Sequence, residues 1–355
     1  MDTNPIDRQP LCNAFVRVMA LTLVALASAS EAACQSGYTR LVVFGDSLSD
    51  YRDSVPNSGT PTGLVQFDAR ASNGFLWCEL VSQRLGVPID NPAVSGSSAI
   101  DVIESQVPLY LGGGSPDPDA LFAIMTSGND LLRAVGPSAE ASTQERESFA
   151  GAIADNIERS VRALAAAGAR SFLVSNALDV ARTPEILSEA APQRAAVRDV
   201  AQRINARLAT ALPALAAELG VEIVAYDFFG FLDDVATDPA SFGLQNVTGP
   251  LMIEETEMIV GDPAVYFWWD GVHPSGTGHR LLADDIMQTL GAAGCSAADL
   301  AAPFGVLSQT DVDAFVSAFF AADPGVASLA PPASVVSQAD VDAFVGLFFA
   351  GCPQA

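Results

Sequence analysis

Only two side chains in the chain could act as an imidazole base, His273 and His279. His273 lies in the segment WWDGVHP, three residues after Asp270. A short turn between these residues would bring the Asp carboxylate to one imidazole nitrogen. Such a contact fixes the tautomer, stabilises the imidazolium and leaves the other nitrogen free to accept a proton. The spacing also fits a loop Asp beside a surface His, which is the commoner case. The spacing alone therefore does not indicate catalysis, and a candidate nucleophile is needed to support that interpretation.

Ser47 is the candidate nucleophile. It lies in LVVFGDSLSDYRD, Leu41–Asp53, after an apolar run, a glycine and an aspartate. A Ser or Asp that follows a strand is also an ordinary helix N-cap, so this segment alone does not choose between the two roles. Three further polar segments follow in order: NPAVSGSSA (Asn91–Ala99), SGND (Ser127–Asp130) and DGVHP. The catalytic interpretation rests on their co-occurrence.

These four segments, in this order, resemble the GDSL or SGNH hydrolase family. The resemblance covers nearly all of Tyr38–Gly294 and extends to RASNGFLWCELVSQRLG, SNALDVARTPE and YFWWDGVHPSGTGHRLLA. These segments are similar to the branch that contains bacterial secreted or autotransported esterases, haemolysin-type phospholipases and plant GDSL lipases. The resemblance implies a three-layer α/β/α fold with a central, mostly parallel, flavodoxin-like sheet. It also implies hydrolysis of carboxylic esters through an acyl-serine intermediate.

The resemblance implies a role for each site residue. Ser47 would be the nucleophile, His273 would remove its proton and later protonate the leaving alcohol, and Asp270 would orient His273. The oxyanion hole would consist of the backbone N–H groups of Ser47 and Gly96 and the side-chain amide of Asn129. Such donors act on the charge that develops in the transition state. No metal ion and no organic cofactor is implied.

Two positions depart from the family pattern. Ser127 stands where the third segment usually has a glycine, and Ser95 stands where this branch often has one. Neither departure removes a reacting group, although Ser127 could shift the geometry next to Asn129. We expect His279 to be a structural residue near the start of a helix rather than a second base.

The elements that must position these residues follow from the apolar pattern. Apolar runs alternate with longer segments of helical spacing from Tyr38 to about Gly294, which indicates a parallel sheet covered on both faces. Catalytic groups should then lie in loops at the carboxyl ends of the strands. We expect strands at Leu41–Asp46, Ala120–Asp130, Ser171–Asp179 and Val221–Asp227, and helices at Gly74–Gly86, Glu147–Ala169, Ala191–Gly220 and in GTGHRLLADDIMQTLGAAG.

The composition limits the classes of partner. The chain has 355 residues, half of them apolar, which is enough for one large domain and a small one. Its formal net charge is −25, and all 17 basic residues are Arg. This balance argues against nucleic acid or an anionic membrane as a partner and favours solubility, in a salty habitat for example. We expect a monomer that acts on an ester small molecule or a lipid.

The N-terminal residues 1–32 are typical of a Sec signal peptide. Two arginines precede the apolar run VMALTLVALASA, which is too short to span a bilayer comfortably, and the small residues of SEA follow it. An anchoring helix is the alternative. We therefore expect a secreted, periplasmic or cell-surface protein of bacterial type. Of the cysteines that would remain, Cys295 and Cys352 are the first choice for a disulfide, whereas Cys78 could be a buried free thiol.

A duplication distinguishes the C-terminal residues 296–355 from the hydrolase domain expected at 35–295. SQTDVDAFVSAFFA (Ser308–Ala321) recurs as SQADVDAFVGLFFA (Ser337–Ala350), and each copy places apolar residues at helical spacing. Two such helices should pack together. The module resembles dockerin repeats, but Ala301, Pro303 and Ser328 stand where calcium ligands belong, so calcium binding is doubtful. We expect it to attach to a partner or cell surface, or to stabilise the C-terminus.

Two alternatives stand beside a secreted esterase. A phospholipase or acyltransferase on the same scaffold would pass through the same acyl-serine, so the Ser47–His273–Asp270 set cannot separate them. A cell-surface binding protein with a vestigial hydrolase domain belongs to another class. The retention of Ser47, Asn129, Asp270 and His273 argues against the latter, since a decayed site tends to lose one of its reacting groups.

Overall fold

The computed structural model describes residues 38–51, 70–254, 256, 258–290, 309–321 and 340–345. The predicted signal peptide, the boundary near Cys295 and the proposed Cys295–Cys352 pair lie outside these residues and stay predictions. Cys78 is described, and it is a buried free thiol whose Sγ lies 3.4 Å from the carbonyl oxygen of Ser49. Burial raises the pKa of this thiol, so it remains an unreactive core group.

Five parallel strands form the central sheet, which confirms the predicted fold class. The strand order is β2-β1-β3-β4-β5, so β1 (Leu41–Gly45) lies between β2 (Ile89–Asp90) and β3 (Leu121–Met125). β4 (Ser171–Ser175) and β5 (Glu222–Tyr226) continue the sheet. All residues of β1 and β3 are buried, as expected for strands covered on both faces. The carboxyl ends of β1, β2 and β3 therefore meet at one edge.

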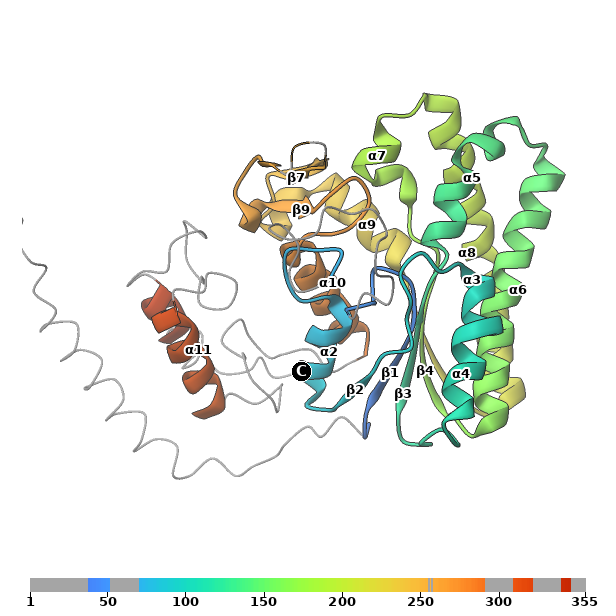
Figure 1. The fold of residues 1–355 in the computed structure, drawn as a ribbon, viewed down its shortest axis with the longest axis horizontal. Coiled ribbons are helices and arrows are strands. Elements are labelled where there is room, and N and C mark those ends of the chain that lie inside the picture. The colour runs from blue at the N-terminus through green and yellow to red at the C-terminus, as the bar shows by residue number, and fades with distance from the viewer. Residues whose placement is uncertain are drawn as a thin grey trace, which may run out of the picture.

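Helices cover both faces of this sheet. In Figure 1, α2 (Trp77–Leu85) and α10 (Gly276–Thr289) lie on one side, and α4 (Val107–Gly112), α6 (Thr143–Ala167) and α8 (Ala191–Leu219) lie on the other. The remaining helical segments are α3 (Ala99–Asp101), η2 (Val102–Gln106), α5 (Gly128–Glu140), η3 (Val180–Arg182), α7 (Pro184–Leu187), α9 (Phe228–Thr237), η4 (Pro239–Phe242) and η5 (Pro263–Val265).

The predicted strands and helices are confirmed, most with shorter bounds, although α6 begins at Thr143 and not at Glu147, and one strand was drawn too long. The strand expected at Ala120–Asp130 ends at Met125, and α5 begins at Gly128. Between them Ser127 has φ 87°, a left-handed conformation that ends the extended run and turns the chain into the helix. Asn129 is consequently a residue of the first turn of α5, not of a strand.

A second layer of short strands lies beyond the carboxyl edge of the central sheet and was not predicted. β6 (Asn246–Pro250) pairs with β9 (Tyr266–Trp268), and β7 (Met252–Ile253) pairs with β8 (Met258–Ile259). Figure 1 shows β7 and β9 at the same end of the molecule as α7. This layer carries the chain directly into the loop with Asp270 and His273.

The described parts of the C-terminal duplication are helical. α11 (Gln309–Ala321) and the helix at 340–345 contact each other through Phe315 and Phe344, whose rings stack with centroids 4.2 Å apart. The two phenylalanines occupy equivalent positions of the two copies, 29 residues apart, which confirms that the repeated helices pack together. The dockerin likeness stays a prediction. Within the described residues, no helix is long and apolar enough to cross a membrane.

Candidate active site

Ser47 lies in a tight turn directly after β1. A Cβ added at Gly45 would approach the carbonyl oxygen of Met125 to 2.1 Å, so only glycine lets β1 pass β3 this closely at its end. The amides of Ser49 and Asp50 both donate to the carbonyl of Asp46 at 3.0 Å. The segment up to residue 51 thus forms a turn and not a helix, and Ser47 is not an N-cap.

The structure brings Ser47, His273 and Asp270 together. His273 Nε2 lies 2.8 Å from Ser47 Oγ. On the other side of the ring, His273 Nδ1 lies 2.8 Å from Asp270 Oδ2 and 3.0 Å from Oδ1. These contacts require Nδ1 to carry the proton toward the carboxylate, which leaves the Nε2 lone pair for the hydroxyl proton. The arrangement can abstract a proton from Ser47.

Charges around the histidine favour its protonated form. Burial alone would lower the pKa of His273, but the Asp270 carboxylate, with weaker contributions from Asp46 and Glu254, raises that pKa above its ordinary value. Burial likewise works against ionisation of Asp270, and the charge and hydrogen bonds of His273 still hold the Asp270 pKa below its usual range. Asp270 is therefore an anion that stabilises the imidazolium formed when His273 accepts a proton.

The loop that carries Asp270 and His273 is fixed by its own backbone. Asp270 Oδ1 accepts from the amides of Val272 at 2.9 Å and His273 at 2.7 Å, and the Trp269 amide donates to the carbonyl of His273 at 2.8 Å. The amide of Glu185 donates to the carbonyl of Gly271 at 2.9 Å and so ties the loop to α7. The three-residue spacing seen in the sequence is thus a hydrogen-bonded turn.

Gly96, in a loop after β2, and Asn129, in the first turn of α5, lie close together at the same edge of the sheet. Gly96 has φ 80° and open space where a Cβ would be, so its glycine is required by backbone conformation and leaves room beside it. Asn129 Nδ2 donates to the carbonyl of Ser97 at 3.1 Å. Ser95, the second departure from the family pattern, donates through its amide (2.9 Å) and hydroxyl (3.1 Å) to Asp50 Oδ2, which links the Gly96 turn to the Ser47 turn.

Gln106 is a site-supporting residue that the sequence did not reveal. It is buried on η2, and its side-chain amide accepts from the Gly45 amide at 3.0 Å and donates to the Gly45 carbonyl at 2.7 Å. The amide nitrogen of the same side chain, Nε2, also donates to Ser97 Oγ at 3.1 Å. One side chain therefore holds the end of β1 and the Gly96–Ser97 turn together. No local motif marks this glutamine, because its partners are 61 and 9 residues away.

The remaining polar candidates have structural roles. His279 is buried, its Nδ1 accepts from the Trp77 amide at 3.3 Å, and burial lowers its pKa to about 3. It is a neutral contact between α10 and α2, as expected. Asp46 is also buried, which raises its pKa to about 6, and its Oδ1 accepts from the Leu48 amide at 3.1 Å.

The aromatic residues just before Asp270 belong to the core. Phe267, Trp268 and Trp269 are all buried, so they pack in the interior.

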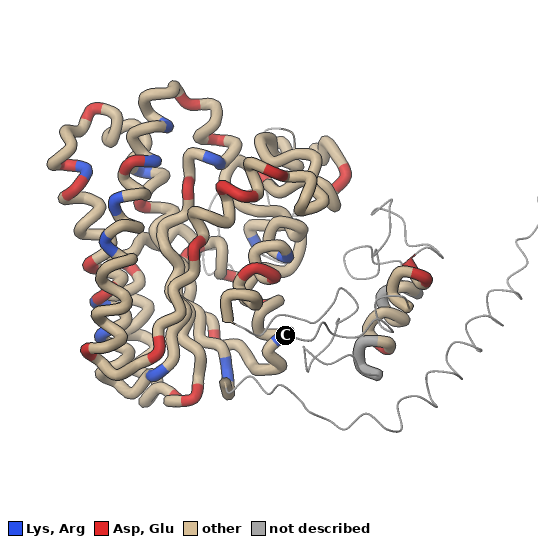
Figure 2. Tube along the Cα trace, turned by 180° about the vertical axis from the view of Figure 1, so that it is seen from behind, with Lys and Arg blue, Asp and Glu red and all other residues tan. Residues whose placement is uncertain are grey.

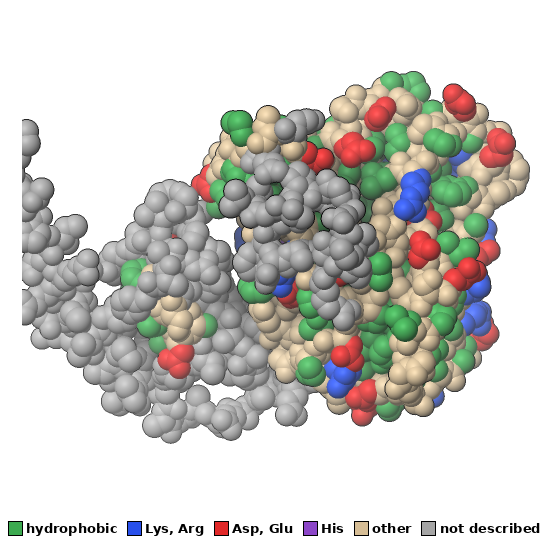
Figure 3. Space-filling view, viewed as in Figure 1, with side chains coloured by type: hydrophobic (Ala, Val, Ile, Leu, Met, Phe, Trp, Pro, Cys, Tyr) green, Lys and Arg blue, Asp and Glu red, His purple; other side chains and the backbone are tan. Residues whose placement is uncertain are grey.

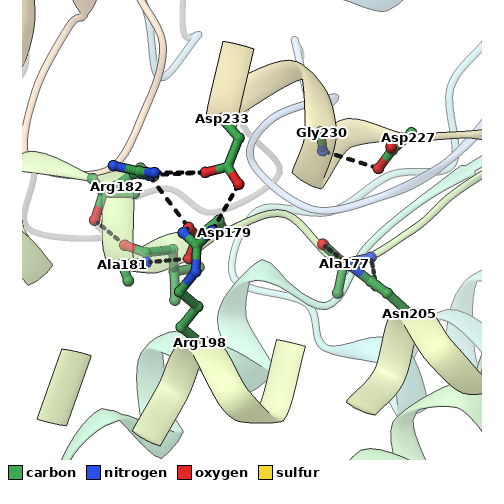
Figure 4. Close-up of polar contacts among 11 residues, drawn as sticks. Ala177, Asp179, Ala181, Arg182, Arg198, Asn205, Asp227, Gly230 and Asp233 are labelled. Carbon is green, nitrogen blue, oxygen red and sulfur yellow. Dashed lines mark hydrogen bonds and ion pairs between the residues drawn. The ribbon is translucent and has the colours of Figure 1, made fainter. Parts of the chain in front are cut away.

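The segment SNALDVARTPE, which follows β4, is held by a polar network (Figure 4). The fully buried carboxylate of Asp179 forms ion pairs with Arg198 and Arg182, and Asp233 bridges the same two arginines at 2.7 Å each. Asn205 on α8 holds the Ala177 peptide from both sides, at 2.8 Å and 2.9 Å. This network fixes the path to α7 and to the Glu185–Gly271 contact.

The chain is similar to several known proteins. The chain is 28% identical over 248 residues to the phosphatidylcholine-sterol acyltransferase of Aeromonas hydrophila, covering 64% of this chain and 70% of that protein. It is 22% identical to the thermolabile hemolysin of Vibrio parahaemolyticus, covering 70% and 63%. It is 23% identical to a GDSL esterase/lipase of Arabidopsis thaliana, covering 77% and 97%.

Solved structures and a family model complete the comparison. The extracellular lipase of Streptomyces rimosus superposes with a TM-score of 0.41 at 17% identity and covers 72% of this chain and 100% of the lipase. The model of the GDSL-like lipase/acylhydrolase family matches residues 41–286, which span β1 to α10 and include Ser47, Gly96, Asn129, Asp270 and His273. The chain therefore belongs to the GDSL-like lipase/acylhydrolase family and is an ester-hydrolysing enzyme.

Proposed function

We propose that the protein is a secreted serine hydrolase that cleaves carboxylic esters, of lipids or of short acyl chains, through an acyl-serine intermediate. The observation that carries this proposal is the continuous set of contacts from Ser47 Oγ through His273 to Asp270. The predicted signal peptide supports the secretion part. The family's ester chemistry supports the reaction class.

The first half of the reaction forms the acyl-serine. His273 Nε2 accepts the Ser47 hydroxyl proton while Oγ bonds to the ester carbonyl carbon. The carbonyl oxygen becomes an oxyanion beside the backbone N–H groups of Ser47 and Gly96 and the amide of Asn129. A side-chain amide has two N–H donors, and one of those of Asn129 contacts Ser97, so the other is available to the oxyanion. Collapse of the intermediate breaks the ester C–O bond, and the leaving alcohol takes the proton from His273.

The second half releases the acid. A water molecule replaces the alcohol, gives a proton to His273 and attacks the acyl-serine carbonyl. The same oxyanion donors act again, and the proton returns from His273 to Ser47 Oγ as the carboxylic acid leaves. Asp270 stays ionised throughout and keeps the imidazole in the tautomer that both halves need.

Substitution of the nucleophile tests the proposal. Ser47→Ala should lower kcat on a soluble p-nitrophenyl ester by about 10³-fold or more, because the other groups cannot form the acyl intermediate. The same variant should lose labelling by a fluorophosphonate probe and keep the circular dichroism spectrum of the native protein. Ser148→Ala, at an exposed serine of α6, is the matched control and should keep full activity. Near-native hydrolysis by Ser47→Ala would refute the proposal.

Acyl transfer to an alcohol is a second candidate. The observation that favours it is the similarity to a phosphatidylcholine-sterol acyltransferase. The acyl-serine would then be attacked by an alcohol instead of water, with the same proton transfers through His273. Product analysis with a radiolabelled acyl ester, with and without an added sterol or short alcohol, separates the two. Formation of a new ester at the expense of free acid would indicate transfer.

A further inference from the structure

Arg133 lies beside the proposed oxyanion hole and has no role in the reaction as described so far. It is exposed on α5, four residues and about one helical turn after Asn129. Its Nη2 donates to the carbonyl of Gly96 at 2.9 Å, and Asn129 Nδ2 donates to the next carbonyl, that of Ser97. The guanidinium is thus in direct contact with the turn whose N–H is expected to hold the oxyanion.

Arg133 differs from most arginines of this acidic protein. Among the described residues, most arginines have a carboxylate oxygen within 4.0 Å: Arg40, Arg70, Arg84, Arg146, Arg159, Arg162, Arg182, Arg198, Arg203, Arg207 and Arg280. Arg133 forms no such ion pair in this part of the chain. A guanidinium that no carboxylate holds in a direct ion pair keeps N–H donors for an anion from outside.

Asp130 and Asp101 attract Arg133 electrostatically, but neither forms an ion pair with it and each accepts hydrogen bonds from other groups. Asp130 Oδ2 accepts from the Ala99 amide at 2.9 Å. Asp101 Oδ2 accepts from the amide and hydroxyl of Ser98, at 2.8 Å and 2.6 Å. A guanidinium has five N–H donors, and the Gly96 carbonyl uses one of those of Arg133. The side chain of Arg133 is exposed, and it also lines a cleft of about 300 Å³ whose other lining residues include Glu145, Arg146 and Phe149.

We propose that Arg133 binds an anionic oxygen group, a phosphate or a carboxylate, that the ester substrate carries close to its scissile bond. This inference rests on the proposed function, since it places the anion next to the oxyanion hole of that reaction. The planar guanidinium can hold two anionic oxygens at once, which makes the contact strong and directional. Because Arg133 contacts the Gly96 turn, this contact orients an anionic ester relative to the proposed oxyanion hole.

A purely structural role is the competing explanation, in which Arg133 only holds the Gly96 carbonyl. That role would affect every ester equally, whereas anion binding affects charged esters alone. Matched substrate pairs separate the two. One pair is p-nitrophenyl butyrate and p-nitrophenyl hemisuccinate, which differ by a carboxylate on the acyl side. The other is dibutyroylglycerol and its phosphate, which differ by a phosphate on the alcohol side.

The test compares the wild type with Arg133→Gln and a matched control, Arg170→Gln. Arg170 also lacks a carboxylate partner among the described residues, and it donates to carbonyls of Ala165 and Ala169 at the amino end of β4, away from Ser47. Arg133→Gln should lower the ratio of anionic to neutral kcat/KM by about 10-fold in at least one pair. The pair that responds identifies the group as phosphate or carboxylate. Arg170→Gln should leave both ratios unchanged.

Two outcomes would overturn the inference. One is an equal loss on neutral and anionic esters, which would leave Arg133 as a positioning residue of the Gly96 turn. The other is no change in either ratio. If the wild type hydrolyses neither member of a pair and carries no Ser47 label, the proposed function itself fails, and that result is distinct from both. Added salt should reduce the wild-type ratio toward that of Arg133→Gln, because it screens the contact.

Discussion

Among the described residues, Ser127 is the one non-glycine residue with a positive φ, a backbone conformation that favours glycine. It has φ 87°, where a non-glycine residue costs about 1–2 kcal/mol, and it is fully buried. Its hydroxyl has no hydrogen-bond partner among the described residues, a further cost. The sequence already marked this position as a departure from the glycine of the family pattern that the chain resembles. The structure supplies the reason: glycine reaches this conformation without strain.

We therefore predict that Ser127→Gly stabilises the protein. The gain should be about 1 kcal/mol, since relief of strain and of the unpaired hydroxyl outweighs the greater freedom of glycine in the unfolded chain. Urea denaturation gives the midpoint, at an unchanged slope. Ser127→Ala is the control, because it removes the hydroxyl and keeps the positive φ. Equal midpoints for Gly and Ala would show that the backbone strain assigned here is absent.

The proximity of Ser47, His273 and Asp270 could be predicted because each lies in a local motif. Ser47 follows β1 at the carboxyl edge of the central sheet, whereas Asp270 and His273 follow β9 outside that sheet, so their contact with Ser47 was expected from the family resemblance and not from sheet topology. Gln106 and Arg133 could not be predicted in the same way. Their partners are distant in the sequence, and a single glutamine or arginine on an amphipathic segment carries no signal of what it will contact.

At the scale of elements, the long periodic segments were predictable and the short ones were not. β1, β3, β4, α6 and α8 have enough residues to show a period. β2 has two residues and β9 has three, so their pairing is decided by the neighbouring strands and not by their own pattern. β7, β8 and β9 were missed for this reason, whereas β6 is as long as β1 but contains a glycine and a proline, which are uncommon inside strands.

The loop after β4 is held in a fixed conformation by ion pairs and hydrogen bonds, although it has little regular secondary structure. The fully buried Asp179 depends on Arg198 and Arg182 for its charge balance, and Asp233 joins these arginines from α9. Through α7 the loop reaches the Glu185–Gly271 hydrogen bond at the catalytic turn. Loss of an ion pair in this network should consequently lower both the stability and the activity of the protein.

We predict that Arg198→Gln destabilises the protein by about 2–3 kcal/mol, because the buried Asp179 carboxylate then keeps only its longer ion pair with Arg182, at 3.5 Å, and the hydrogen bond from the Ala181 amide. It should also lower kcat more than it raises KM, since the loop positions His273 and not the substrate. Arg162→Gln is the control: its pair with Glu218 is exposed, so its loss should cost less than about 1 kcal/mol. Equal losses for the two variants would argue against a special role for the network.

For the whole molecule, the dominant feature is its charge. Figure 2 shows Asp and Glu on all sides of the described chain, and on the face seen in Figure 3 they are separated by apolar and neutral surface. The sequence holds 42 acidic and 17 basic residues. Most described arginines are already paired, so the surplus carboxylates repel one another with few cations left to offset them. Screening should weaken that repulsion and the exposed ion pairs together.

We predict that repulsion outweighs the pairs, because each exposed pair contributes only about 0–1 kcal/mol while the surplus charges act on one another across the molecule. Tm should rise by a few degrees as NaCl increases from about 0.01 M, where the Debye length is about 30 Å, to about 0.15 M, where it is about 8 Å. Little further rise should follow above that concentration, which separates screening from the general stabilising effect of concentrated salts. A fall in Tm over the first interval would mean that the ion pairs of the described arginines, and not the surplus of carboxylates, control the electrostatic part of stability.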